Sequence, residues 1–193
     1  MAEVRSTFSL RRGDSAPGFQ LPAADGTVHD LHAVRGLEGL LVVFACNHCP
    51  YVIHLAPQLG SLAAEIEAEG VNTVAISSND IEKYPADAPE HIATFAAEHG
   101  WNFPYLFDES QEVAKAYGAA CTPDFFLFDR ELRLYYAGQF DDSRPKSGQP
   151  ATGDDLRAAA KSMLAGEEAP ARPFPSSGCN IKWKPGSEPP YFA

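Results

Sequence analysis

The sequence predicts an α/β protein with a central mixed sheet flanked by helices, an N-terminal β-hairpin extension and an extended C-terminal arm. Short apolar runs at 40–45, 71–77 and 125–128 indicate buried strands. Segments with helical spacing of apolar residues lie between these runs, and strands that alternate with helices imply parallel βαβ units. A proline-rich stretch at 166–193 cannot continue this alternation and indicates the arm.

The remaining elements follow in chain order. An Asp25-Gly26 turn between alternating apolar residues indicates a hairpin over 13–36. Strands are expected at 40–45, 71–77, 104–107, 125–128 and 132–137, the last two antiparallel. Helices are expected at 50–69, 89–99, 110–117 and 154–164. Together these elements form one expected domain over 1–165.

The arm, 166–193, has six prolines in 28 residues. Proline lacks a backbone N–H group, so we expect neither a helix nor a central strand there. The arm also carries the aromatic side chains of Phe174, Trp183, Tyr191 and Phe192. Disordered segments tend to lack such residues, so we expect the arm to dock on the domain.

The composition argues against several classes of protein. A net charge of −11 disfavours nucleic acid or an anionic membrane as the main partner. No apolar run approaches the length of about 18 residues that a membrane span needs. The first residues hold no signal-peptide core, so the cytoplasm is the expected location. Neither G-x-G-x-x-G nor a Walker loop occurs, and we expect no cofactor.

The stretch Cys46-Asn47-His48-Cys49 carries the strongest chemical signal. It follows the strand expected at 40–45 and directly precedes a helix. Unpaired N–H groups and the positive end of the helix dipole favour a thiolate there. An exposed thiolate attacks a disulfide, and the second thiol resolves the mixed disulfide. We therefore expect thiol–disulfide exchange, in which Cys46 attacks and Cys49 resolves.

The order of strand, C-x-x-C, helix, strand, helix and strand resembles the thioredoxin fold. The segment from Tyr117 to Phe128, which contains Thr122 and Pro123, is similar to the thioredoxin stretch around its cis-proline. The resemblance implies that Pro123 is cis and that Thr122 and Pro123 contact the substrate. Asn47 is expected to contact the substrate as well.

A wider pattern resembles the peroxiredoxin-like, redoxin-domain branch of the thioredoxin superfamily. Its motifs are Asn47-His48-Cys49-Pro50-Tyr51-Val52, Asn79-Asp80, Tyr84-Pro85, Pro123-Asp124-Phe125 and Gly178-Cys179-Asn-Ile-Lys-Trp183. This resemblance implies peroxide reduction, an antioxidant activity, as the alternative function. However, peroxiredoxins carry Pro-x-x-x-Thr-x-x-Cys, and neither Cys46 nor Cys49 follows such a motif. Thioredoxin also has a buried aspartate in the strand before its C-x-x-C stretch, whereas the run 40–45 is wholly apolar. The buried proton acceptor is therefore missing or is supplied by another segment of the chain.

His48 directly precedes the second cysteine, which resembles the Cys-Pro-His-Cys motif of disulfide oxidases of the DsbA type. A nearby cation and helix-end N–H groups lower the pKa of a thiol. Stabilising the thiolate raises the reduction potential. We therefore expect a lowered pKa for Cys46 and a pair that is more oxidising than that of thioredoxin. In the alternative interpretation, His48 is only a solvated loop residue.

Two further cysteines are candidates for redox chemistry. Cys121 lies two residues before Pro123, so the fold places it near the C-x-x-C stretch. It is either an additional redox thiol or a small buried hydrophobic residue. Cys179 lies in the arm, which can bring it toward Cys121 or the active site. It is either a resolving thiol or a packing residue.

Four cysteines could also bind a metal ion, which would place the protein in a different functional class. Cys121 and Cys179 do not form a second C-x-x-C stretch, and the other candidate ligands, His48 and His54, add no recognised pattern. We therefore expect no metal. The acidic loop at 79–90 fits no calcium-binding pattern and is expected to be solvent-exposed.

The expected partners are protein or small-molecule disulfides and a thiol reductant that the sequence does not identify. Nucleic acid and membranes are not expected partners. Assembly as a homodimer is left open.

Overall fold

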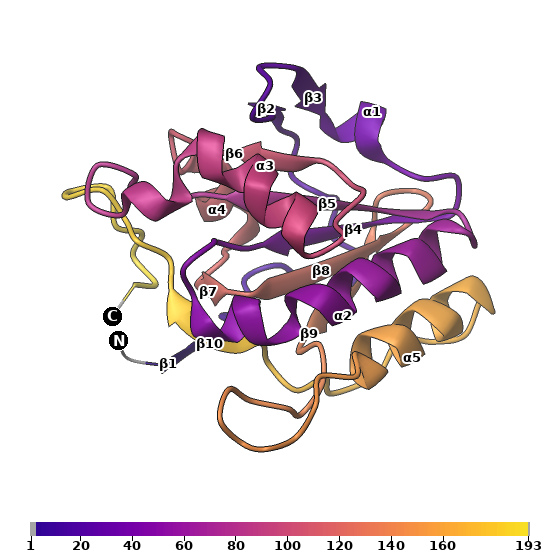
Figure 1. Ribbon diagram of the computed structural model, residues 1–193. Helices are drawn as coiled ribbons and strands as arrows, with labels where there is room; N and C mark the ends of the chain where they lie inside the picture. Colours follow the sequence, from indigo (N-terminus) through magenta and orange to yellow (C-terminus); the bar gives the residue numbers. More distant parts are fainter. Residues whose placement is uncertain (1–2, 193) are drawn as a thin grey trace.

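A computed structural model describes residues 3–192, and its centre is a five-stranded mixed sheet (Figure 1). The strand order is β6-β5-β4-β8-β9. The strands are β4 (Gly39–Phe44), β5 (Val71–Ser77), β6 (Tyr105–Phe107), β8 (Asp124–Asp129) and β9 (Leu134–Gly138). Strands β4, β5 and β6 are parallel, whereas β8 is antiparallel to both β4 and β9. The expected mixed sheet is confirmed.

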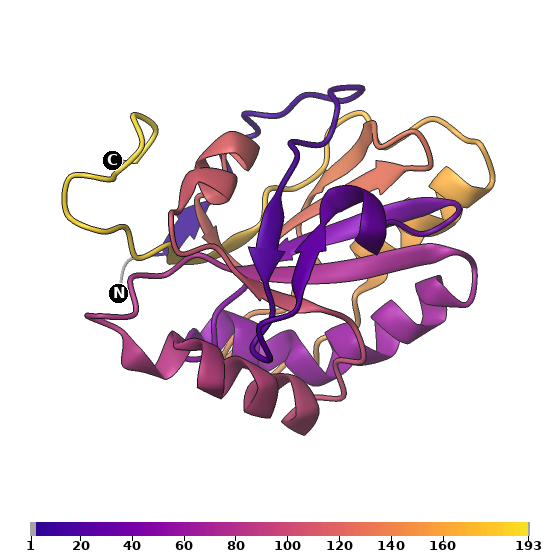
Figure 2. The ribbon, with the colours of Figure 1, turned by 90° about the horizontal axis from the view of Figure 1, so that it is seen from above.

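Helices cover both faces of this sheet (Figure 2). One face packs against α2 (Pro50–Glu67), α3 (Pro89–Glu98) and α5 (Asp154–Leu164). The other face packs against α4 (Glu112–Tyr117), α1 (Leu31–Val34) and the hairpin of β2 (Gln20–Pro22) and β3 (Val28–Asp30). The four expected helices and the hairpin lie close to their expected ranges. The sequence interpretation missed α1, a single turn whose N-cap is Asp30.

The central strand β4 is apolar throughout because both of its faces are buried. Leu41 and Val43 point toward the layer of α2, whereas Leu40, Val42 and Phe44 point toward the hairpin layer. All five residues are fully buried. Side chains of a strand alternate between faces, so a strand covered on both sides shows a continuous apolar run.

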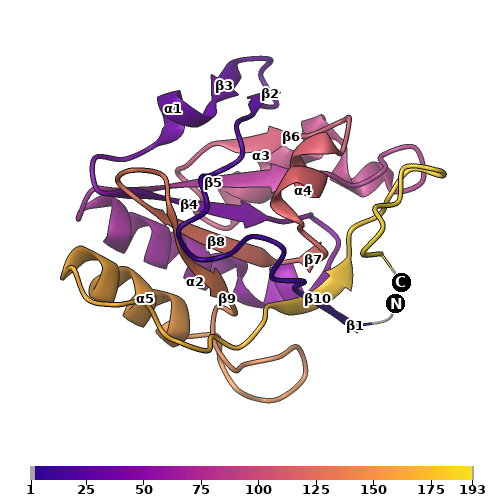
Figure 3. The ribbon, with the colours of Figure 1, turned by 180° about the vertical axis from the view of Figure 1, so that it is seen from behind.

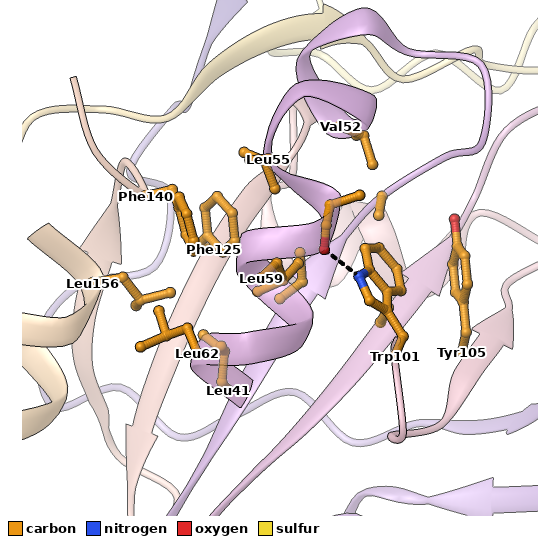
Figure 4. Close-up of a cluster of buried hydrophobic side chains, with 14 of the residues drawn as sticks. Leu41, Val52, Leu55, Leu59, Leu62, Trp101, Tyr105, Phe125, Phe140 and Leu156 are labelled. Atoms are coloured by element: carbon orange, nitrogen blue, oxygen red, sulfur yellow. Dashed lines mark hydrogen bonds between the residues drawn. The ribbon is translucent and has the colours of Figure 1, made fainter. Parts of the chain in front are cut away.

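Helix α2 is held against the sheet along one side (Figure 4). Leu59 and Leu62 belong to the same buried cluster as Leu41 of β4. The indole Nε1 of Trp101 donates a hydrogen bond to the Ala56 carbonyl at 2.8 Å. This packing sets the position of the N-terminal end of α2, where the C-x-x-C stretch lies. Among residues 3–192, no helix is long and apolar enough to cross a membrane.

A second, three-stranded sheet joins three distant parts of the chain (Figure 3). Its order is β1 (Glu3–Arg5), β10 (Ser177–Asn180) and β7 (Cys121–Thr122), and both pairings are antiparallel. The expectation that the arm forms no central strand is wrong, because β10 is the central strand here. Its four residues include no proline, so their N–H and C=O groups are free to pair on both sides.

Candidate active site

Both thiols of the C-x-x-C stretch lie at the start of α2. Cys49 is the N-cap residue, and Pro50 takes the first helical position, where a missing N–H group costs nothing. The Ala45 N–H group donates to the Ile76 carbonyl at 2.9 Å, which holds this edge of the sheet together. Cys46 and Cys49 are unpaired, and only 1% and 0% of their surfaces are exposed. The expectation of an exposed thiolate is therefore wrong for this conformation.

One wall of the site is formed by Thr122 and Pro123, which are joined by a cis peptide bond. The Thr122 hydroxyl lies 3.4 Å from Cys46 Sγ, and the Thr122 carbonyl oxygen lies 3.1 Å from Cys49 Sγ, which donates a hydrogen bond to it only in the protonated form of the thiol. Thr122 is itself buried. The segment expected to meet the substrate thus lies against both thiols, and its contact with a substrate stays a prediction.

The other wall is the arm strand β10. Cys179 pairs with Thr122 across the sheet and belongs to the same buried cluster as Cys49, so that each thiol shifts the pKa of the other. Gly178 permits this close approach, since a Cβ atom there would lie 2.0 Å from the Thr122 carbonyl oxygen. The arm therefore covers the thiol pair and contributes to its burial.

A buried carboxylate that the sequence interpretation missed lies beside Cys46. Asp87 ends the 3-10 helix η1 (Pro85–Asp87) and is fully buried. It accepts hydrogen bonds from the Asn47 N–H group at 2.8 Å, from His48 Nδ1 at 2.7 Å and from Asn79 Nδ2 at 2.8 Å. The expected exposure of the loop 79–90 is wrong at Asp87 and also at Asn79, Asp80 and Ala88. At Asp87, three donors compensate the burial of the charge.

Only the position of Asp87 in the chain could have indicated that it belongs to the site. The loop 79–90 follows β5, and β5 lies parallel to β4. The carboxyl ends of these neighbouring strands therefore meet at one edge of the sheet, where active groups of α/β proteins gather. Sequence spacing alone does not say which of the loop's acidic residues turns inward.

His48 lies between this carboxylate and the surface. Its side chain is 21% exposed, and its ring stacks on Tyr84 with the centroids 5.4 Å apart. The bond to the Asp87 carboxylate assigns a ring proton to Nδ1. Nε2 is buried and has no hydrogen-bond partner within residues 3–192. The expected role of His48 in tuning a thiolate stays a prediction. In this geometry, His48 would act on the thiols through its hydrogen bond to Asp87.

The pKa values of the two thiols shift in opposite directions. The pKa of Cys49 lies well below its usual value because the sulfur accepts hydrogen bonds from the thiols of Cys179 and Cys46. The Val52 N–H group, at the third helical position, adds a further hydrogen bond, as is usual at an N-cap. The pKa of Cys46 is raised by its hydrogen bond to Cys49, by burial and by the charge of Asp87. The raised pKa of Cys46 is opposite in direction to the lowered pKa expected from the sequence.

Three side chains of the site could hold a metal ion. Cys46 Sγ, a ring nitrogen of His48 and a carboxylate oxygen of Asp87 lie within 4.8 Å of one another. An ion would have to replace the hydrogen bonds that Asp87 already accepts. His54 lies outside this group and hydrogen-bonds to the Ser143 hydroxyl at 2.9 Å. The expectation of no metal stays a prediction.

Cys121 lies next to the site but is completely buried. Its thiol donates to the Pro123 carbonyl at 3.5 Å, and burial raises its pKa. A thiol with a raised pKa forms little thiolate and is a poor nucleophile. The geometry therefore favours the packing interpretation, while a redox role for Cys121 stays a prediction.

The residue after Pro123 is a buried acid. Asp124 accepts hydrogen bonds from the Ser6 hydroxyl at 2.5 Å and from the Ala120 N–H group at 3.2 Å. Burial nevertheless raises the pKa of Asp124 from 3.8 to about 6. The folded protein therefore binds this proton more tightly than the unfolded chain does.

This difference predicts a pH dependence of stability. Between about pH 4 and pH 6 the unfolded chain has released the proton of Asp124 while the folded protein keeps it, so stability falls as the pH rises. This effect should cost about 2 kcal/mol between about pH 4.5 and pH 7. Asp124→Asn should remove that loss, which urea denaturation of both proteins at the two pH values measures. Identical pH dependence in both proteins would contradict the raised pKa.

A pair of hydrogen-bonded thiols at a helix start, facing a cis-proline segment, defines a thiol-dependent oxidoreductase of the thioredoxin fold. A family model independently matches residues 11–154, and its description is Redoxin. The chain therefore belongs to the Redoxin family.

Similar proteins agree with this class. A crystal structure of a conserved protein from Geobacillus kaustophilus is 49% identical with a TM-score of 0.92, over 96% of this chain and 98% of that one. Peroxiredoxin Bcp of Escherichia coli is 30% identical over 56% of this chain and 65% of its own length. The thioredoxin domain of a thiol-disulfide oxidoreductase from Bacteroides vulgatus is 18% identical with a TM-score of 0.63, over 81% of this chain and 99% of that one. The last match shows the fold alone.

Together, the family match and these relatives confirm three expectations from the sequence. The chain has a thioredoxin-like fold, it resembles the redoxin branch because it is a member of that family, and it is an oxidoreductase. The relatives of the chain include proteins named for disulfide chemistry and proteins named for peroxide chemistry. The choice between these reactions depends on the site itself.

Proposed function

We propose that the protein catalyses thiol–disulfide exchange through the Cys46–Cys49 dithiol, with protein or small-molecule disulfides as substrates. The observation that carries this proposal is the hydrogen-bonded thiol pair at the start of α2, in contact with Thr122. A dithiol so close together can alternate between two thiols and one disulfide, which is the requirement of two-step exchange.

The hydrogen bond between the thiols gives the reaction a simple start. The two thiols share one proton, and the charge of Asp87 favours its position on Cys46. When it moves to Cys49, Cys46 becomes the thiolate that attacks a substrate disulfide and releases the first substrate thiolate. Cys49 then attacks Cys46 in the mixed disulfide, and the second substrate thiolate leaves and takes up the proton. The substrate gains two electrons, and the protein ends with a Cys46–Cys49 disulfide.

Asp87 and His48 suit the handling of the proton on Cys46. Asp87 lies close to this sulfur and its charge opposes that of a thiolate, so it favours the protonated form at rest. Its hydrogen bond to His48 connects this buried carboxylate to a side chain that reaches the surface. We assign both as positioning residues, with Asn47 and Thr122–Pro123 as the groups that meet the substrate.

Single cysteine variants test the proposal. Cys46→Ser and Cys49→Ser should each lose turnover of a protein disulfide such as that of insulin, because both thiols are needed. Cys49→Ser should instead capture a peptide disulfide as a stable mixed disulfide at Cys46, detected by mass spectrometry. Cys121→Ala is the matched control and should keep turnover. Retained turnover in Cys46→Ser would show that Cys46 is not the nucleophile.

Peroxide reduction is the second candidate, and the low pKa of Cys49 favours it. A thiolate at a helix start is the species that peroxide oxidises. The position three residues earlier holds Cys46 in place of the threonine of peroxiredoxins. We therefore expect disulfide turnover to exceed hydrogen peroxide consumption when both are measured with the same thiol reductant. The reverse order would make the protein a peroxidase.

The electron donor, location and assembly belong to this proposal as well. We propose a thiol reductant as the donor and the cytoplasm as the compartment, and a homodimer stays open. Alkylation of the cysteines in intact cells would test the compartment, because a reducing cytoplasm keeps such thiols largely reduced. A steady-state disulfide in growing cells would argue for an oxidising compartment.

A further inference from the structure

Three thiols, one of them on β10, form one contiguous group. All three surround Thr122: its hydroxyl lies 3.4 Å from Cys46 Sγ, its carbonyl oxygen lies 3.1 Å from Cys49 Sγ, and Cys179 pairs with it across the sheet. Cys49 is the middle member, because the thiols of both Cys46 and Cys179 lower its pKa. All three residues are buried in the same cluster. A thiolate exchanges only with a disulfide sulfur that it can reach. The contact between Cys179 and Cys49 meets that requirement.

The backbone of β10 holds Cys179 in this place. On one edge, Cys179 pairs with Thr122 of β7, and on the other edge it pairs with Glu3 of β1. The neighbouring Gly178 lies so close to Thr122 that a single added Cβ atom would clash with its carbonyl oxygen. The arm also lies along the backbone edge of Thr122, the residue expected to receive a substrate. Cys179 therefore occupies a fixed position on the substrate side of the thiol pair.

We propose that Cys179 is a third exchange-active thiol, which accepts the disulfide formed at the C-x-x-C pair. This inference rests on the proposed function, which supplies the Cys46–Cys49 disulfide. The Cys179 thiolate attacks Cys49 Sγ, a Cys49–Cys179 bond forms, and the Cys46–Cys49 bond breaks. Cys46 leaves as a thiolate and takes up the proton that Cys179 released. The number of disulfides stays the same, so the step needs no further oxidant or reductant.

Formation of the Cys46–Cys49 disulfide removes negative charge beside Cys179, which favours the Cys179 thiolate that this step needs. In the reduced protein, the hydrogen bond to Cys49 and the negative charge there raise the pKa of Cys179. Both effects disappear once Cys49 is part of a disulfide. The ammonium group of Lys182, which lowers the pKa of Cys179, remains. Cys179 thus becomes easier to ionise when a disulfide is present for it to attack.

The transfer has a consequence for the oxidised protein. Cys46 lies beside the half-buried Asn47 and His48, whereas Cys179 belongs to β10 and Cys49 lies in the same buried cluster as Cys179. After the transfer, the disulfide includes Cys179 of β10, and Cys46 is again a free thiol. A protein-sized reductant would then have to displace β10 before it reaches the disulfide.

Disulfide mapping of the full chain tests this inference. Wild type, Cys46→Ser and Cys179→Ser are oxidised with diamide, a small oxidant, then quenched with acid, alkylated and analysed by mass spectrometry. We expect Cys46→Ser to form an intramolecular Cys49–Cys179 disulfide whose yield does not depend on protein concentration. Wild type should show both disulfides, and Cys179→Ser should show only Cys46–Cys49.

Two outcomes separate this inference from the proposed function. If wild type forms Cys46–Cys49 but Cys179 stays open to alkylation in Cys46→Ser, Cys179 only packs and the proposed function stands. If wild type forms no Cys46–Cys49 disulfide, the proposed function fails and the transfer fails with it. Cys121→Ala is the matched control and should keep the wild-type pattern. Circular dichroism checks the fold of each variant, and Cys46→Ala repeats the test without a hydroxyl group.

Discussion

Replacing Asp87 by alanine should lower the free energy of unfolding by about 3–5 kcal/mol, because it removes the acceptor of three hydrogen bonds in a buried site. The donors on Asn47, His48 and Asn79 would lose this partner. The loop that carries η1 would also lose its main attachment to the start of α2. Urea denaturation monitored by tryptophan fluorescence measures the loss.

Asp87→Asn separates the charge of this side chain from its shape. The charge of Asp87 raises the pKa of Cys46, so its removal should shift the alkylation of Cys46 by iodoacetamide toward lower pH. A purely structural role predicts no such shift. Asn79→Ala removes one donor and leaves the charge in place, and it serves as the control. An unchanged alkylation profile in Asp87→Asn would show that the charge of Asp87 does not raise the pKa of Cys46.

Gly178→Ala should cost about 3 kcal/mol of stability and should separate β10 from β7. The added Cβ atom would lie 2.0 Å from the carbonyl oxygen and 2.7 Å from the carbonyl carbon of Thr122. Both atoms belong to the backbone, so no side-chain rotation can relieve the clash. We expect Cys179 to lose its contact with Cys49, and alkylation of Cys179 in the native protein should become faster.

Gly18→Ala is the matched control for this prediction. No atom lies within 4 Å of the position where its Cβ would be, and its backbone conformation is open to other residues. This substitution should change stability by less than about 0.5 kcal/mol. Equal effects at Gly18 and Gly178 would show that the close approach of β10 to Thr122 is not a constraint. Slow alkylation of Cys179 in a folded Gly178→Ala protein would contradict the expected separation of the strands.

Local patterns predicted the long elements well. Strand β5 spans the expected residues, 71–77, and α5 spans the expected residues, 154–164. Their signals lie within the segment itself, as a buried apolar run or as a repeat of apolar residues every three or four positions. The short strands β1, β7 and β10 were missed, because each exists only through its pairing with a distant segment. Proline content also misled the interpretation of the arm, since it describes the whole arm and not the four residues of β10.

The sequence by itself determined that a C-x-x-C stretch follows a buried strand and opens a helix, because strand, dithiol and helix start are neighbours along the chain. Only the tertiary structure decided in which direction the pKa of each sulfur shifts. The pKa of Cys49 depends on Cys179, which lies 130 residues later, and that of Cys46 depends on Asp87, from a loop after the next strand. Hydrogen bonds and charges act over a few ångströms in space, so their effect on a thiol is set by which distant segments the fold brings to it.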